Sequence, residues 1–77
     1  MNQTTATPGA VQLLEHLKST LQLKNDAALA RKFGVAPPVV SKIRHGVLPV
    51  GDSFLIKSHE IGGMSFAELR TFVPVPA

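Results

Sequence analysis

Five consecutive residues in the middle of the chain, 34–38, restrict its possible folds more than any other segment. Glycine readily adopts the positive φ with which helices end, so Gly34 predicts the end of one helix. Two consecutive prolines fit a helix only in its first turn, so Pro37 and Pro38 predict the start of another. Only Val35 and Ala36 lie between these signals. The sequence therefore predicts two helices joined by a sharp bend.

Apolar residues on both sides of this bend recur with the spacing of a helix. A small side chain at Ala30, four residues before Gly34, allows the second helix to approach closely. Gly46 is the expected end of that helix, and a loop is expected from there to Gly51. The residues expected in the core are Leu29, Ala30 and Phe33 before the bend and Val40 and Ile43 after it, and the helical spacing of the second helix is expected to continue to Val47.

Two more helices are expected, one near each end of the chain. Pro8 at a first helical position, with Thr7 as its N-cap, predicts a helix whose apolar stripe is Leu14, Leu17 and Leu21. Ser65 and Glu68 have the spacing of a capping box, which opens a last short helix reaching about Phe72.

A further helix is expected before this last one. It runs from Asp52 to Ile61, with Asp52 or Ser53 as its cap, and Gly62 with Gly63 ends it. No stretch of the sequence alternates apolar and polar residues for long enough to predict a β-sheet. The predicted fold is therefore an all-α bundle of five helices, with a flexible N-terminus over residues 1–7, one helix-turn-helix domain over residues 8–72 and an extended Pro-rich tail over residues 73–77.

Composition excludes several classes of function. The chain of 77 residues has no cysteine, which excludes disulfides, iron–sulfur clusters and thiol nucleophiles. No apolar run approaches the roughly 18 residues of a membrane helix. The first basic residue is Lys18, so no charged leader precedes an apolar segment. We expect a cytoplasmic, nucleoid-associated protein with no membrane partner, no metal and no cofactor.

Positive charge is concentrated around the bend. The whole chain has a net charge of +3, whereas residues 24–44 alone have five basic residues and one acidic residue. Such an excess suits a phosphate-bearing partner, although a merely solvated basic face has the same composition. The charged residues of this window are Lys24, Asp26, Arg31, Lys32, Lys42 and Arg44.

Residues 28–46, ALARKFGVAPPVVSKIRHG, resemble the lambda-repressor and Cro-like (XRE-type) family of helix-turn-helix proteins. With the surrounding helices, the likeness extends over roughly residues 10–70. It implies a sequence-specific regulator of transcription that binds double-stranded DNA, usually a phage or bacterial repressor acting as a homodimer on a palindromic operator. In such proteins the later helix of the motif lies in the major groove and the earlier one crosses the backbone.

The resemblance also implies a set of DNA-contacting residues. This chain differs from the family at Pro37 and Pro38, two positions at which the family commonly has polar side chains. Prolines offer only apolar contact there, for example to a thymine methyl. Asp26 stands near the position of a phosphate-binding glutamine, and its charge would oppose a phosphate unless backbone N–H groups or Lys24 compensate. The implied DNA-binding residues are Lys24, Asn25, Ala36, Pro37, Pro38, Ser41, Lys42, Arg44 and His45.

Other interpretations of these residues are weaker. Ser41 and His45 could form a nucleophile–base pair, but no orienting acid accompanies them, and we expect no enzymatic activity. His16, His59 and Glu60 would ligate a metal only if the fold brought them together. The alternative from a different class is an antitoxin-like helical module that binds another protein and for which DNA is secondary. Apolar residues near the C-terminus are candidates for a dimer contact.

Overall fold

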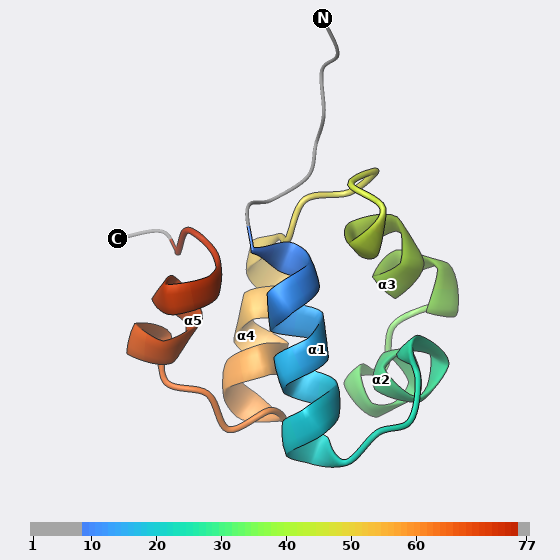
Figure 1. Cartoon of the computed structure of the whole chain (residues 1–77), viewed down its shortest axis with the longest axis horizontal. Coiled ribbons are helices and arrows are strands. Elements are labelled where there is room, and N and C mark those ends of the chain that lie inside the picture. The colour runs from blue at the N-terminus through green and yellow to red at the C-terminus, as the bar shows by residue number, and fades with distance from the viewer. Residues whose placement is uncertain (1–8, 76–77) are drawn as a thin grey trace, which may run out of the picture.

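The computed structural model describes residues 9–75, which form five helices joined by short connections (Figure 1). No strand occurs among these residues, so the expected all-α fold of five helices is confirmed. The helices are α1 (Ala10–Leu21), α2 (Asp26–Phe33), α3 (Pro37–Arg44), α4 (Asp52–Glu60) and α5 (Phe66–Phe72).

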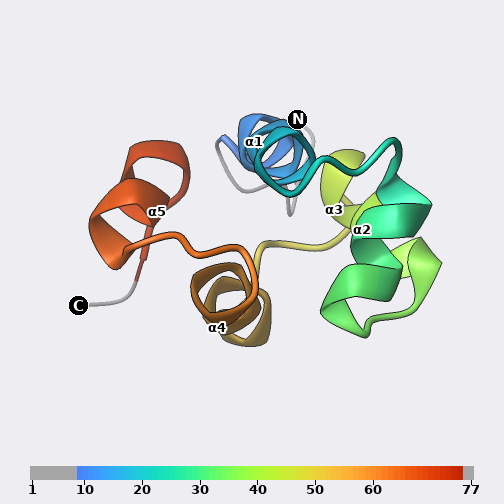
Figure 2. The ribbon, with the colours of Figure 1, turned by 90° about the horizontal axis from the view of Figure 1, so that it is seen from below.

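The helices form a flat body of 37 × 28 × 18 Å. In both views α1 and α4 occupy the middle, with α2 and α3 on one side and α5 on the other (Figures 1 and 2). The most extensive contact between helices joins α2 to α3, and α1 touches α2, α3 and α5. The α2–α3 pair therefore lies at one end of the molecule and is held there mainly by α1.

A single apolar core joins the five helices. Leu13, Leu14 and Leu17 of α1 are completely buried and form its centre. The rings of Phe33 and Phe54 lie 5.0 Å apart between centroids and link α2 to α4. Buried apolar surface is the main favourable term in folding, so this core fixes the position of the short helices, which are too short to be stable alone.

Local signals in the sequence are confirmed at most helix ends. The Asn25 side chain accepts a hydrogen bond of 2.8 Å from the backbone N–H of Ala28 and so caps α2. Gly34 ends α2 with φ 71°, and prolines occupy the first two positions of α3. Ser65 and Glu68 form the expected capping box of α5, with hydrogen bonds of 3.1 and 3.0 Å.

The N-terminal ends of α1 and α4 differ from the prediction. Helix α1 begins at Ala10, with Gly9 as its N-cap, whereas the predicted cap and proline, Thr7 and Pro8, lie outside the described residues. A Cβ atom on Gly9 would lie only 1.7 Å from the Phe72 carbonyl oxygen, so the approach of α5 requires glycine there. Helix α4 has Gly51 at its N-cap, so neither Asp52 nor Ser53 caps it, and it ends at Glu60.

The prediction for Val47 is wrong. Helix α3 ends at Arg44, and Gly46 has a positive φ of 76°. The chain therefore leaves the helical path before Val47 can continue the apolar face of α3. Val47 is consequently 58% exposed, and Val50 instead reaches the core from the loop.

The segment after α5 is extended, as expected, but it is not a free arm as far as residue 75. Val73 has extended backbone angles and is buried, while Val75 packs against the core and is partly buried. Residues 76–77 and the predicted flexible N-terminus, 1–7, lie outside the described part of the chain. Across residues 9–75, no helix has both the length and the apolar character needed to cross a bilayer.

Candidate nucleic-acid interface

The bend between α2 and α3 has a fixed geometry. The backbone N–H groups of Gly34 and Val35 donate to the carbonyls of Arg31 and Ala30, at 3.2 and 3.0 Å, and close the end of α2. Ala36 is extended, and α3 then begins at Pro37. Side chains of Ala30, Val40 and Ile43 are buried, so core contacts hold the two helices at this angle. The arrangement consists of two short helices, three connecting residues and one positive-φ glycine.

One face of α3 is exposed along its whole length. At about 100° per residue, five exposed residues of α3 and its C-cap span an arc of about 140°, away from Val40 and Ile43. Ala36 is exposed just before them. The structure thus brings together most of the residues that the family resemblance implied for DNA. The exposed face consists of Pro37, Pro38, Ser41, Lys42 and His45.

The two ends of this face differ in chemistry. Pro37 and Pro38 have no backbone N–H, and the N–H of Val39 donates to the carbonyl of Ala36 at 2.9 Å. The first turn of α3 is therefore apolar and poor in donors. Polar groups occur only further along, in Ser41, Lys42 and His45.

The histidine of this face has a defined tautomer. His45 Nδ1 lies 2.8 Å from the backbone carbonyl oxygen of Ser41, and because a carbonyl only accepts, Nδ1 carries the proton. The Ser41 hydroxyl lies 3.4 Å from the same nitrogen. A protonated Nδ1 cannot accept the hydroxyl proton, so this pair lacks the geometry of an activated nucleophile.

Arg44 does not belong to the exposed face. Its guanidinium points toward α1 and α2, where Nε and Nη2 donate to the two Asp26 carboxylate oxygens at 2.6 and 2.8 Å. Nη2 also donates to Glu15 Oε2 at 2.5 Å. Lys18 Nζ lies 3.1 Å from a carboxylate oxygen of each acid. We call Glu15, Lys18, Asp26 and Arg44 the four-charge cluster.

The four members stabilise one another's charged forms. Hydrogen bonds from Arg44, and secondly from Lys18, hold the pKa values of Glu15 and Asp26 below their usual ranges. Hydrogen bonding to Asp26 and Glu15 raises the pKa of Arg44, and bonding to Glu15 raises that of Lys18. Two positive and two negative charges leave the cluster neutral. Asp26 therefore does not present the uncompensated negative charge that the sequence suggested.

Sequence reasoning missed this cluster. The separation of three residues between Glu15 and Lys18 on one helix was the only local signal. The partners of Arg44 are 18 and 29 residues away in the chain, and only the packing of three helices brings them together.

The other basic residues near the bend are exposed. Lys24 precedes α2 and is exposed, whereas the side-chain oxygen of the neighbouring Asn25 is used in capping α2. Arg31 and Lys32 are exposed in the last turn of α2. Together with Lys42, these side chains provide positive charge that the four-charge cluster does not neutralise.

The remaining histidines have structural contacts. The ring of His16 lies 4.9 Å from that of Phe72. His59 Nδ1 lies 2.8 Å from the Met64 carbonyl oxygen, and its ring stacks on Phe66 at 4.6 Å. Within residues 9–75, no three His, Asp or Glu side chains gather closely enough to hold a metal ion.

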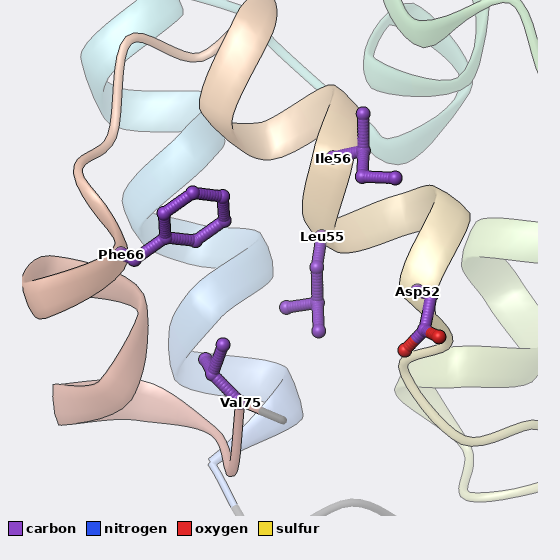
Figure 3. A pocket seen from close by; sticks show the side chains of 5 residues that line it. All are labelled: Asp52, Leu55, Ile56, Phe66 and Val75. Carbon is purple, nitrogen blue, oxygen red and sulfur yellow. The ribbon is translucent and has the colours of Figure 1, made fainter. Parts of the chain in front are cut away.

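A second surface feature lies on the side of α4 that faces α5. An open hollow lies between α4 and α5 and is mostly apolar, with Leu55 at its centre and Val75 on its border (Figure 3). Ile56 is 49% exposed and Phe66 is 42% exposed. The lining residues are Asp52, Leu55, Ile56, Phe66 and Val75.

Comparison of the chain with protein-family models, with curated proteins and with solved structures finds no match. Its function must therefore be inferred from the geometry of its surfaces. The α3 face and the α4–α5 hollow are the two features that can be interpreted chemically.

Proposed function

We propose that the protein is a sequence-specific double-stranded DNA-binding regulator, of the phage or bacterial repressor type, that reads DNA with α3. The observation that carries this proposal is the exposed α3 face on a helix fixed by core contacts and by a three-residue bend to α2. Two short helices with a three-residue joint are what a helix-turn-helix unit requires, which supports the proposal. An α-helix with its side chains is about 10–12 Å wide and fits a major groove about 12 Å wide.

Each part of the surface has a distinct role in this proposal. The apolar first turn, Pro37 and Pro38, suits thymine methyl groups, while Ser41 and Lys42 supply donors for base edges. The exposed Lys24, Arg31 and Lys32 suit the phosphate backbone and would provide affinity through counterion release.

Selection from random duplexes with the purified protein tests the proposal directly. We expect enrichment of a near-palindromic site. Contact with about four phosphates predicts that affinity falls about a hundredfold between 50 and 200 mM salt. Absence of duplex binding even at low salt would refute the proposal.

Lys42 provides the sharpest test of the reading helix. It is exposed near the middle of the α3 face. If it contacts a guanine, Lys42→Ala weakens binding to the selected site by about 1–3 kcal/mol. Arg70→Ala, which removes an exposed charge from α5 at the opposite end of the molecule, is the matched control and should have little effect. Equal binding by both variants would remove Lys42 from the interface.

The second candidate is an antitoxin-like module whose main partner is another protein. The observation that favours it is the α4–α5 hollow, because exposed apolar hollows are typical of protein contacts. Salt-insensitive or absent duplex binding would favour this function over the first.

A further inference from the structure

Under the proposed function, helix α3 has to keep a fixed orientation relative to α1 and α2, yet few of its side chains are buried. It is eight residues long, and only Val40 and Ile43 of its side chains are buried in the core. Isolated helices of this length are marginal in water. The bend fixes the first turn of α3, whereas in its last turn Ile43 is the one buried apolar side chain, so a polar attachment there would add to the hold on this helix.

Arg44 occupies this last turn. Its planar guanidinium contacts both carboxylate oxygens of Asp26, the first residue of α2, and also reaches Glu15 on α1. Asp26 and Arg44 also lie where helix dipoles favour their charges, at the start of α2 and the end of α3. A forked guanidinium holds a carboxylate in one orientation, which a flexible ammonium does not.

We infer that Arg44 is a positioning residue, which acts through Asp26 and Glu15 to fix α3 against α1 and α2 in the orientation that binds DNA. This inference rests on the proposed function. It assigns Arg44 a role different from the direct DNA contact that the family resemblance implied. The side chains of Arg44 and Asp26 are only 24% and 25% exposed, and the Nε and Nη2 groups of Arg44 already donate to protein acceptors.

The inference makes an unusual prediction for Asp26. Removal of a negative charge near a DNA-binding surface ordinarily strengthens binding to phosphates. If Asp26 instead holds Arg44 and thereby α3, Asp26→Asn weakens binding. Arg44→Met, which keeps an unbranched side chain but removes the charge, weakens it too.

The experiment measures duplex affinity against salt for the full chain and four variants. We expect about tenfold weaker binding for Asp26→Asn, for Arg44→Met and for the double variant, because the two residues act as a unit. The slope of log affinity against log salt stays that of the parent. Lys24→Met, at an exposed residue proposed to meet the phosphate backbone, is the control for a direct phosphate contact and should reduce this slope by about one.

Tighter binding by Asp26→Asn, or a slope reduced by about one in Arg44→Met, would overturn the inference and identify Arg44 as a phosphate contact. If Arg44→Met fails to fold, Arg44→Lys takes its place, with a smaller loss of affinity and an unchanged slope expected.

If the parent protein binds no duplex, the proposed function fails, and amide hydrogen exchange then tests positioning on its own. If the Asp26→Asn substitution accelerates amide exchange in α3 more than in α5, relative to the parent protein, this would support the attachment of α3 by this cluster. Unchanged exchange in α3 would refute it.

Discussion

At the scale of single residues, Gly62 shows how tightly the core closes. A Cβ atom there would lie 2.6 Å from the Ser58 carbonyl oxygen and 2.7 Å from Leu17 Cδ2. Gly62→Ala therefore forces displacement of backbone at the end of α4, and we expect it to lower the free energy of unfolding by about 1–3 kcal/mol. Urea unfolding followed by circular dichroism measures this loss.

Gly51 provides the control for this substitution. A Cβ atom on Gly51 would meet no atom within 4 Å, and its φ of −86° suits any residue. Gly51→Ala should change the free energy of unfolding by no more than about 0.5 kcal/mol. Equal losses in the two variants would show that α1 and α4 do not approach as closely as described.

Residue chemistry predicts those features that depend on near neighbours in the chain. Gly34, Pro37 and Asn25 define their helix ends through their own backbone or their own side chain, and all three are where the sequence placed them. Gly9 at the start of α1 was not predictable because α5, more than 60 residues later, requires it. The ion pairs of Arg44 were not predictable for the same reason, since its charge was visible but its distant partners were not.

At the scale of the element, α5 depends strongly on its capping box. The helix has only seven residues, and Ser65 satisfies the Glu68 backbone N–H at 3.1 Å. Ser65→Ala should cost about 0.5–2 kcal/mol of stability, as measured by thermal or urea unfolding. Ser53→Ala is the matched control because Gly51, not Ser53, is the N-cap of α4. A loss of similar size in the control would contradict the helix starts described above.

The four-charge cluster makes the α1–α2–α3 unit sensitive to acid. Its carboxylates, Glu15 and Asp26, have pKa values lowered by Arg44 and then by Lys18. A carboxyl group whose pKa is lower in the folded state contributes stability above its unfolded pKa, near 4, and this contribution is lost as pH falls through the folded value. Stability should therefore decrease below about pH 4.

Urea unfolding between pH 6 and pH 2.5 measures this effect. Asp26→Asn should be less stable at pH 6 and should lose less stability on acidification, because one of the two titrating carboxyls is gone. Parallel curves for the parent and this variant would show that Asp26 contributes nothing to the acid response.

At the scale of the whole molecule, the two surface features are separate. The α3 face belongs to one end, and the hollow lies between the central helix α4 and α5 at the other end (Figures 1 and 2). Local periodicity in the sequence predicted the helices, and the family resemblance implied most of the residues of the α3 face. The sequence indicated only a general excess of apolar residues near the C-terminus, because α4 and α5 have to pack before Leu55, Phe66 and Val75 can line one hollow.

The proposed function predicts a homodimer, and the α4–α5 hollow is its candidate interface. Operator half-sites one helical turn apart require the two reading helices to be separated by about 34–36 Å, so each lies about 17–18 Å from the two-fold axis. The molecule is 37 Å long, and α4 lies between α3 and α5 (Figure 1). A two-fold axis at the hollow would place Ile56 and Phe66 of each copy against the other.

Ile56→Glu tests this dimer, since it places a charge in an interface that is otherwise mostly apolar. We expect the dimer dissociation constant, measured by sedimentation equilibrium, to increase at least tenfold, and binding to a full palindrome to weaken while binding to an isolated half-site stays unchanged. Val47→Glu is the control for self-association, because it adds the same charge at an exposed apolar residue outside the hollow. Equal dissociation constants for the two variants, or a monomeric parent up to millimolar concentration, would eliminate the hollow as the dimer interface. A half-site affinity reduced as much as that for the palindrome would instead indicate that Ile56→Glu damages the fold, which unfolding measurements on the same sample would reveal.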